Sequence, residues 1–475
     1  MKDKRKKAFY EHFENLAEKY PTYRKRYGYY WNRIINYCNY FIHEDNSVLE
    51  IGCGTGQTIS KLKGKNKTGI DFSPKMIEQA KNRYANISFH VMEAENIELE
   101  EKFDVIIISN VVGFFENVLD VFESVKKVCH KDTRIIITYY NYIWEPMMNF
   151  GEFIGIKTKT PQQNWLSTND IENLFYLSDF QVFNSSKDVL LPVNIPIFSY
   201  LLNKFIAPLP LFNSLCLNSY VSARAMPVKK EATEAEYSVS IVIPARNESG
   251  NIENAIKRMP AFGKHVEVIF VEGNSTDDTW EKIREVSEKY KDTHDIKTAR
   301  QDGKGKGDAV RKGFSMATSD ILMILDADLT VPPEELPKFY NAIASGKADF
   351  INGSRLVYPM GKQAMRFLNV LGNKFFSNVF SWILGFPIKD TLCGTKVMFR
   401  KDYEKLTKNR AYFGDFDPFG DFDLLFGAHK LNLKIVDLPI HYQERTYGDT
   451  NISRFSHGWL LLKMCWFAIW KLKFK

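Results

Sequence analysis

The chain has 475 residues, of which 44% are hydrophobic and 25% are charged. A chain of this length exceeds what one hydrophobic core usually serves, so we expect two domains and exclude disorder throughout. The net charge of +7 suits anionic partners such as nucleotide diphosphates or a membrane surface. The lysines are scattered, so no nucleic-acid partner is expected, and the one basic run, Lys2 to Lys7, is interpreted as a solvated arm.

The spacing of the cysteines and the apolar stretches indicate the cellular compartment and the kind of membrane contact. The six cysteines form no Cys-x-x-Cys pair, and no apolar stretch follows the basic N-terminus, so a reducing cytoplasm is expected and a secretory signal is not. Three apolar stretches, Ile195 to Leu217, Met365 to Phe386 and Gly458 to Phe474, are each broken by polar residues. We therefore expect contact with the inner face of a membrane as a peripheral protein, not a membrane span.

The first half alternates short β-branched runs with helical stretches, which favours an open, mainly parallel αβ sheet. The expected strands are Ser47 to Ile51, Thr68 to Ile70, Ile87 to Val91, Phe103 to Ser109 and Thr133 to Tyr139.

Acidic and glycine residues stand at the ends of these strands. Gly52, Gly54 and Gly56 directly follow the first strand, where a turn without side chains lets the backbone approach a ligand. Asp71 ends the second strand, and a carboxylate there can accept both hydroxyls of a ribose. Further along, Glu93 lies where an acid can reach an adenine amino group, and Asn110 closes the fourth strand.

These pieces, in this order, resemble class I methyltransferases from the first strand to Tyr142. The resemblance implies a Rossmann-like fold and S-adenosylmethionine as cofactor. The cofactor contacts it implies are Glu50, Gly52, Gly54, Asp71, Glu93 and Asn110. Glu93 stands where aspartate is usual. A nicotinamide-binding Rossmann unit, or a domain that binds the cofactor without reacting, stays open, and the methyl acceptor is not readable.

The stretch 224–238 is polar and charged, and we interpret it as a linker between a first domain, 1–223, and a second, 239–455. The second half again alternates strands and helices, with the pattern of another open, mainly parallel sheet. Its expected strands are Val239 to Ile243, Val266 to Val271, Ile321 to Leu325 and Phe350 to Asn352.

Polar residues gather after these strands as well. Pro244, Arg246, Asn247 and Glu248 end the first of them, and Glu272 ends the next, at the edge where αβ sheets bind ligands. The loop that contains Lys306 offers glycines and lysines before a helix, which suits a diphosphate.

The sequence Asp326-Ala327-Asp328 follows the third strand. In an extended chain this spacing places both carboxylates on one side. Carboxylates of this kind hold Mg²⁺ or Mn²⁺, which neutralise charge on a departing nucleoside diphosphate. A lone Asp-x-Asp usually marks a surface turn, and the motifs that precede it here give it weight.

Together these motifs resemble the inverting glycosyltransferase family two, with its GT-A fold, over most of Val239 to Ser453. Three later segments are similar to enzymes that glycosylate polyprenyl or dolichyl phosphate: Asp390 to Lys401, Gly420 to Phe426 and Arg445 to Asn451. The resemblance implies a nucleotide-sugar site at Pro244, Arg246, Asn247, Glu248, Glu272, Lys306, Asp326, Ala327 and Asp328. It implies metal ligation by Asp326 and Asp328, with Asp328, Asp421 and Arg445 in the reaction.

Two acceptors remain open. An ionised phosphate monoester needs charge pairing, which Arg445 supplies, whereas a hydroxyl requires Asp421 as general base. Segment 456–475 carries Trp459, Trp466 and Trp470 among lysines, a pattern that fits an interfacial helix, one packed on the domain, or one used in homo-oligomers.

We therefore expect a bifunctional enzyme, a membrane-associated sugar transferase acting on polyprenyl phosphate and an S-adenosylmethionine-dependent methyltransferase. The alternative is a glycosyltransferase acting on a hydroxyl, with the first domain a cofactor-binding scaffold that does not react.

Overall fold

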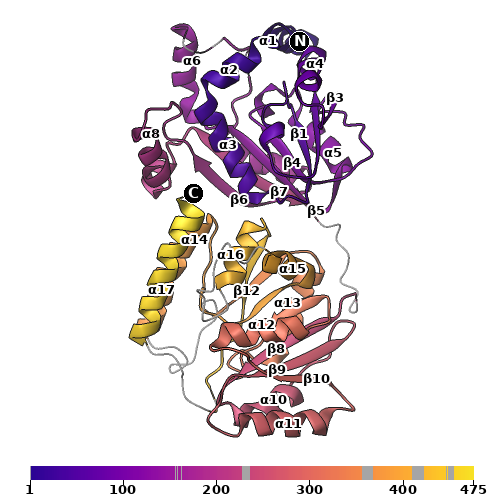
Figure 1. The fold of residues 1–475 in the computed structure, drawn as a ribbon, viewed down its shortest axis with the longest axis vertical. Helices are drawn as coiled ribbons and strands as arrows, with labels where there is room; N and C mark the ends of the chain where they lie inside the picture. Colours follow the sequence, from indigo (N-terminus) through magenta and orange to yellow (C-terminus); the bar gives the residue numbers. More distant parts are fainter. Residues whose placement is uncertain are drawn as a thin grey trace. The chain divides into compact units, whose positions relative to one another are not determined.

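The computed structural model describes residues 2–155, 157, 159–161, 163–226, 236–355, 367–408, 422–445, 447 and 454–474. The chain divides into two compact units, with the division between Met226 and Pro227. Figure 1 shows a central sheet flanked by helices in each unit.

The first unit is built on a seven-stranded sheet in the order β3-β2-β1-β4-β5-β7-β6. The first five strands by sequence are parallel, and β7 runs antiparallel to both of its neighbours. The strands are β1 (Ser47–Ile51), β2 (Asn66–Asp71), β3 (Ser88–Val91), β4 (Phe103–Ser109), β5 (Cys129–Tyr140), β6 (Phe180–Asp188) and β7 (Asn218–Ala225). In the dinucleotide-binding Rossmann sheet the strand order is 3-2-1-4-5-6, so an antiparallel strand between β5 and β6 argues against that alternative.

The sequence did not predict β6 and β7. Both mix polar and apolar residues and lack the continuous apolar run that marks the parallel strands. Arg224 and Ala225 pair with β6, and Arg224 also donates to the Gln181 side chain at 3.2 Å. The prediction that the linker begins at residue 224 was therefore wrong at its start.

Apolar clusters fill both faces of this sheet. One contains Ile106, Phe122 and Phe175, and the other contains Trp31, Ile107 and Tyr220. Neighbouring residues of β4 thus point to opposite faces, as the pleat of a strand requires. The longer helices are α1 (Lys2–Leu16), α2 (Tyr20–Arg26), α3 (Gly28–Phe41), α4 (Pro74–Arg83), α5 (Val118–Lys127), α6 (Glu145–Phe153) and α7 (Thr168–Leu177). Shorter ones are η1 (Ile59–Lys61), η2 (Val112–Phe114), η3 (Tyr142–Trp144), α8 (Phe198–Leu201), η4 (Leu202–Ile206) and α9 (Pro210–Asn213).

The second unit has its own seven-stranded sheet, ordered β10-β9-β8-β11-β13-β12-β14. Here β13 is antiparallel to β11 and to β12, and the other pairs are parallel. The strands are β8 (Val239–Ala245), β9 (Val266–Glu272), β10 (Asp295–Arg300), β11 (Ile321–Ile324), β12 (Phe350–Ser354), β13 (Lys396–Phe399) and β14 (Ile435–Pro439). The expectation of two αβ domains with mainly parallel sheets is confirmed.

Helix α12 packs on β8 and β9, so the glycine–lysine loop before it lies at the carboxyl ends of these strands. The helices of this unit are α10 (Ser249–Lys257), α11 (Thr279–Tyr290), α12 (Lys306–Met316), α13 (Leu336–Ala344), α14 (Phe367–Leu384), α15 (Arg400–Lys408), α16 (Phe422–Lys430) and α17 (Arg454–Ala468), with η5 (Pro333–Glu335) and η7 (Ile469–Lys473). Within the described part of the chain, no helix has both the length and the apolar character needed to span a bilayer.

Candidate functional site

The glycine turn after β1 is tightly built. Gly52, Gly54 and Gly56 all have positive φ, at 71°, 53° and 75°. A Cβ on Gly52 would lie 2.7 Å from a methyl group of Val111, and one on Gly54 would lie 3.2 Å from the Tyr20 ring. Residues with a Cβ rarely adopt this backbone conformation, so both positions require glycine.

Asp71 holds this turn against the end of β2. Its carboxylate accepts the backbone N–H of Gly54 at 2.8 Å and that of Ser73 at 3.0 Å. Burial raises the pKa of Asp71 to about 6, although both hydrogen bonds favour the ionised form. A buried carboxylate beside a glycine turn is placed to accept hydrogen bonds from a ligand's hydroxyl groups.

A pocket opens at this edge of the first sheet. Gly52, Gly54, Asp71 and Glu93 line it, and an apolar wall faces them. That wall comprises Phe9, Phe13, Ile51, Ile70, Phe72, Met76, Met92, Val111, Phe114 and Phe115. A largely apolar hollow with a few converging polar groups is the usual form of a small-molecule site.

Two predicted residues stand outside this lining. Glu50 is buried, accepts the Ile59 N–H at 2.9 Å, and has its pKa raised to about 8 by burial. Asn110 is also buried, and its amide donates to the Tyr30 hydroxyl at 2.7 Å. Both side chains support the turns around the pocket.

Lys2 to Lys7 lie on α1, where Arg5 and Lys6 line the pocket, so the prediction of a solvated arm was wrong for the backbone, although the Lys6 side chain is half exposed. Lys6 forms a 2.6 Å ion pair with Glu93, and Arg5 donates to the Asn164 side chain at 2.9 Å. Sequence reasoning missed α1 as a wall of the site. Phe9 and Phe13, four residues apart, were the available sign of an apolar helix face.

In the second unit, Asp326 and Asp328 follow β11 in a turn. The strand ends at Ile324, and Ala327 and Asp328 are in the turn, so the extended-chain argument for the orientation of the two carboxylates does not hold. Each carboxylate has its own cationic partner. Lys306 lies 2.7 Å from Asp326, and Arg445 lies 2.8 Å from Asp328.

Asp326 is held as a carboxylate. Burial alone would raise its pKa, but the nearby charges of Lys306, Lys396 and Arg355 outweigh burial and lower it. Gly394 packs so closely that a Cβ there would lie 2.2 Å from both the Asp326 carboxylate and the Lys306 ammonium. The glycine of the Asp390 to Lys401 motif therefore leaves room for this ion pair.

Arg445 joins Asp328 to the first strand of the unit. It donates to Glu248 at 2.8 Å as well as to Asp328 at 2.8 Å. Glu248 also accepts from the Asn251 amide at 2.7 Å, and burial raises its pKa. Segments around residues 248, 328 and 445 are thus brought together at the carboxyl ends of β8 and β11.

The remaining predicted residues shape the neighbouring turn. Glu272 accepts the Ser275 N–H at 2.5 Å, and Asn247 accepts the Thr276 N–H at 2.8 Å. Pro244 pairs within the sheet, Arg246 is exposed and Ala327 is buried. Asp421 lies outside the described residues.

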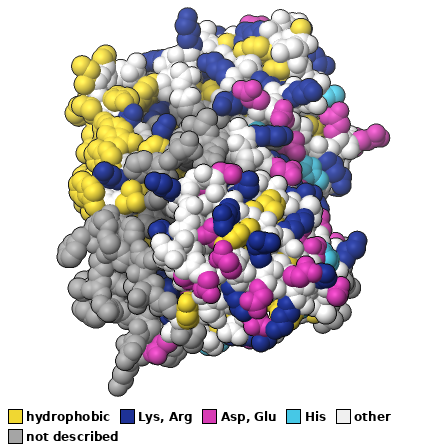
Figure 2. All heavy atoms as spheres, turned by 60° about the horizontal axis from the view of Figure 1, so that its bottom comes forward, with side chains coloured by type: hydrophobic (Ala, Val, Ile, Leu, Met, Phe, Trp, Pro, Cys, Tyr) yellow, Lys and Arg dark blue, Asp and Glu magenta, His cyan; other side chains and the backbone are white. Residues whose placement is uncertain are grey.

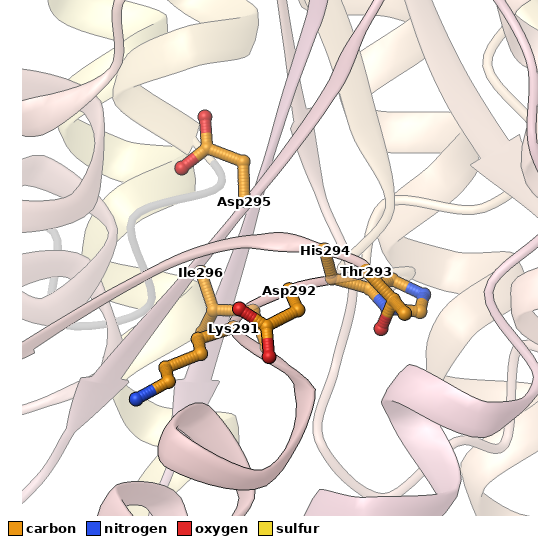
Figure 3. A pocket seen from close by; sticks show the side chains of 6 residues that line it. All are labelled: Lys291, Asp292, Thr293, His294, Asp295 and Ile296. Carbon is orange, nitrogen blue, oxygen red and sulfur yellow. The ribbon is translucent and has the colours of Figure 1, made fainter.

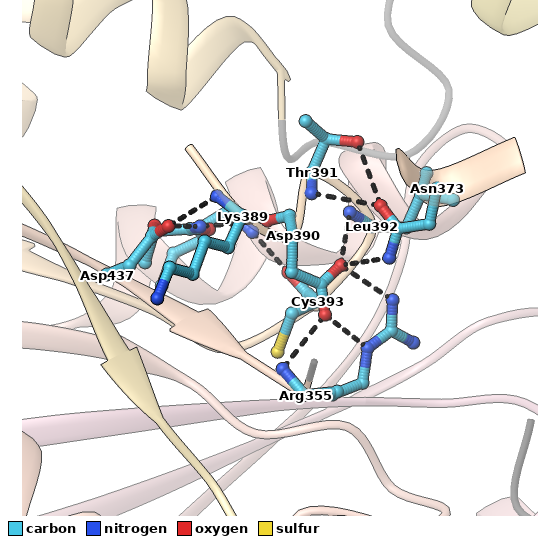
Figure 4. A network of polar contacts seen from close by, with 10 residues as sticks. Arg355, Asn373, Lys389, Asp390, Thr391, Leu392, Cys393 and Asp437 are labelled. Carbon is cyan, nitrogen blue, oxygen red and sulfur yellow. Dashed lines mark hydrogen bonds and ion pairs between the residues drawn. The ribbon is translucent and has the colours of Figure 1, made fainter. Parts of the chain in front are cut away.

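A buried polar network centred on Asp390 lies close to this site (Figure 4). Asp390 accepts two bonds from the Arg355 guanidinium, at 2.7 and 2.9 Å, and one from the Asn373 amide at 2.8 Å. Although burial opposes ionisation, Arg355 holds the pKa of Asp390 at about 2. Arg355 also lowers the pKa of Asp326, which couples this network electrostatically to the site.

A second hollow, lined by the consecutive residues 291–296, lies between α11 and β10 (Figure 3). It is at the amino end of β10, because Asp295 pairs with Glu267 and Arg300 with Glu272. The hollow is therefore at the opposite edge of the sheet from Asp326, Asp328 and Glu248.

The two units thus have the form of αβ domains, with a pocket at the carboxyl edge of the first sheet and clustered charged side chains at that of the second. Residues 42–176 match the family model described as a methyltransferase domain, and residues 240–407 match that of glycosyl transferase family 2. The chain combines a methyltransferase domain with a glycosyl transferase family 2 domain.

Individual relatives match the chain over part of its length. A dolichol-phosphate mannosyltransferase of Pyrococcus furiosus is 40% identical over 122 residues, which are 25% of this chain and 33% of that protein. An undecaprenyl-phosphate 4-deoxy-4-formamido-L-arabinose transferase of an Enterobacter species is 26% identical over 226 residues, 46% of this chain and 64% of that one. Among solved structures, a SAM-dependent methyltransferase of Thermotoga maritima has 15% identity, 46% coverage of this chain, 99% of its own and a TM-score of 0.37.

Proposed function

We propose that the second unit transfers a sugar, with inversion, from a nucleoside diphosphate sugar to a polyprenyl phosphate. The observation that carries this proposal is the pair of contacts by which Arg445 joins Asp328 to Glu248. A cation held between two acids beside the Asp326–Lys306 pair fits a reaction with negative charge on both donor and acceptor. The printed names of two relatives, dolichol-phosphate and undecaprenyl-phosphate sugar transferases, support the same acceptor class.

The donor's diphosphate would lie against Lys306 and the two aspartates. Within the described ranges, no group of three or more His, Cys, Asp or Glu residues is placed so that it could hold a metal ion. Asp326 and Asp328 nevertheless fit Mg²⁺ or Mn²⁺, which such enzymes bind through one or two carboxylates plus substrate phosphates. A bound divalent cation would neutralise charge on the departing diphosphate. Lys306 would contribute a further positive charge, and the lowered pKa of Asp326 keeps that carboxyl ionised.

The acceptor phosphate would be oriented by Arg445. A guanidinium is always charged and presents parallel N–H groups that match phosphate oxygens. The oxygen of an ionised phosphate would attack the anomeric carbon as the bond from that carbon to the nucleoside diphosphate breaks. No proton need be removed from such an oxygen, so the reaction does not require a general base. An acceptor with a polyprenyl tail places the enzyme at a membrane surface, and we propose the cytoplasmic one.

The first unit would bind S-adenosylmethionine in the pocket beside the glycine turn. Asp71 would accept the ribose hydroxyls, Glu93 would lie near the adenine, and the aromatic residues of α1 would cover the cofactor. Transfer from a sulfonium needs alignment of the acceptor atom more than acid–base assistance, so the unit's main task would be to position it.

The test is incubation of the purified protein with labelled nucleotide sugars, Mg²⁺ and a short-chain polyprenyl phosphate, followed by solvent extraction. We expect label in the organic phase that mild acid releases as free sugar. Label that appears only on soluble glycans, with none on the lipid, would overturn the lipid acceptor. A parallel incubation with labelled S-adenosylmethionine tests methyl transfer to the lipid product.

A further inference from the structure

The connection between β6 and β7 in the first unit presents its apolar side chains outward. Its exposed large apolar residues are Val193, Ile195, Ile197, Phe198, Tyr200, Leu201, Leu211, Phe212 and Leu215. Ile197 is 77% exposed and Leu211 is 76% exposed. We call residues 193–215 the apolar surface. In Figure 2 hydrophobic side chains gather along the left edge of the view, the side on which Figure 1 labels α8.

Two polar side chains of the same connection, those of Asn203 and Ser199, are buried and bond to its own backbone. Asn203 is 1% exposed. Its side-chain amide donates to the Leu191 carbonyl at 2.7 Å, and its side-chain oxygen accepts the Leu191 N–H at 2.8 Å. Ser199, fully buried, donates to the Val193 carbonyl at 2.7 Å and accepts the Ile195 N–H at 2.8 Å. Internal hydrogen bonds therefore fix the backbone, and the apolar side chains contribute little to that packing. In a segment that faces water, polar side chains are usually exposed and large apolar side chains are usually buried, which is the opposite of this arrangement.

The end of this connection contacts the residues just before α6. The Trp144 indole donates to the Leu215 carbonyl at 2.8 Å, and the Asn141 amide donates to the Cys216 carbonyl at 2.9 Å. On α6 itself, Phe150 is 60% exposed and Phe153 is 83% exposed. An apolar patch of this extent on one side of a unit marks a site of association.

The charged residues in and around the apolar surface indicate which kind of partner it contacts. No aspartate or glutamate occurs between Asp188 and Glu231. Within the surface Lys204 lies 2.7 Å from the Tyr200 hydroxyl and 4.9 Å from the centre of that ring. Aromatic and lysine side chains side by side are typical of segments that insert apolar groups below lipid headgroups while the ammonium stays among the phosphates. The absence of acidic residues from 189–230 removes repulsion between this stretch and anionic lipids.

We propose that the apolar surface docks the methyltransferase domain onto an anionic lipid bilayer, lying in the headgroup region without crossing it. This membrane docking rests on the proposed function and extends it, because a polyprenyl-phosphate acceptor resides in such a bilayer. It places the methyltransferase domain itself on the membrane, in addition to any contact made by α17. The methyl acceptor is then presented from the lipid phase or its headgroup layer.

The test is co-sedimentation of the full chain with vesicles of phosphatidylcholine mixed with phosphatidylglycerol, and with phosphatidylcholine alone. The variant is Ile197→Glu with Leu211→Glu, which puts two acids among the lipids without touching Asn203 or Ser199. The matched control is Tyr176→Glu with Leu177→Glu, an apolar pair on α7 that is also mostly exposed, at 67% and 59%. S-adenosylmethionine affinity reports that each variant is folded.

We expect wild type and control to bind mixed vesicles, and the Ile197/Leu211 variant to bind at least tenfold more weakly with its cofactor affinity retained. Unchanged vesicle binding by that variant would overturn the proposal. So would a wild-type dimer, seen in analytical ultracentrifugation, that the variant dissociates while vesicle binding stays the same. Sugar transfer to a detergent-solubilised polyprenyl phosphate is measured separately: if it fails while the vesicle result holds, the proposed function falls and the docking surface stands.

Discussion

Arg445 donates a hydrogen bond to Asp328 at 2.8 Å, although 117 residues separate them in the sequence. The other terminal nitrogen of the same guanidinium, Nη1, donates to Glu248. A cation between two acids offsets the repulsion between their carboxylates. The two contacts also hold the Arg445 guanidinium at the carboxyl ends of the strands.

Asp328→Asn should reduce sugar transfer by at least about 100-fold, because it removes a carboxylate that would bind the divalent cation on the donor's diphosphate. S-adenosylmethionine affinity, measured by calorimetry, should not change, since Asp328 belongs to the other unit. The control is Glu334→Gln, which breaks an exposed ion pair with Arg258 in the same unit. Equal loss of cofactor binding and sugar transfer would contradict two independent sites.

Arg445→Ala and Asp421→Asn separate the two acceptor classes. If the acceptor is a phosphate, loss of Arg445 should lower kcat/KM by about 100-fold or more, whereas Asp421→Asn should retain much of the activity, because no proton has to be removed. Steady-state rates with varied polyprenyl phosphate provide the measurement. The reverse pattern would indicate a hydroxyl acceptor and a base at Asp421.

Gly54→Val should abolish S-adenosylmethionine binding and leave sugar transfer unaffected. Its φ of 53° disfavours a side chain, and the added atoms would meet Tyr20 and fill the approach to the turn. Gly155→Val is the control, because Gly155 also has positive φ, at 76°, but a Cβ there meets nothing within 4 Å. If Gly54→Val bound the cofactor as wild type does, the proposed pocket would be wrong.

Glu50→Gln should gain stability relative to wild type as the pH rises. Burial raises the pKa of Glu50 to about 8, so the native state favours the protonated carboxyl. Its contribution to stability is present at pH values below the ordinary carboxyl pKa and is lost as the pH rises toward 8. Glutamine has no charge to bury, so the difference in unfolding free energy between variant and wild type should shift by about 3 to 4 kcal/mol from pH 5 to pH 8. Urea denaturation without cofactor measures it, and a constant difference would contradict the buried charge.

Asp390→Asn should destabilise the second unit by about 3 to 5 kcal/mol, because it leaves the Arg355 guanidinium buried without its carboxylate. The pKa of Asp390 is lowered to about 2, so the pair's stabilisation is present above the ordinary carboxyl pKa and is lost as the pH falls toward 2. The exposed pair of Asp302 with Lys312 is the comparison, and Asp302→Asn should cost less than about 1 kcal/mol. Unfolding curves that coincide for the two variants would argue against the network in Figure 4.

The sequence determined the local parts of both domains, because continuous apolar runs mark parallel strands buried on both faces and because the turn residues follow them directly. Thus β1, β4 and β8 were located, as were the glycines after β1 and the acids after β2, β9 and β11. It did not reveal β6 and β7, whose polar residues hide the strand pattern and which become strands by pairing with each other and with β5.

Only the tertiary structure decided which distant groups meet. Arg445 lies between Glu248 and Asp328, Arg355 holds Asp390, and α1 brings Lys6 to Glu93. Such pairings depend on the order of strands in a sheet and on side-chain packing between segments far apart along the chain, which no local pattern encodes. The same holds for the outward face of residues 193–215. The sequence shows these residues to be apolar, but the inward hydrogen bonds of Asn203 and Ser199 decide that their side chains point away from the core.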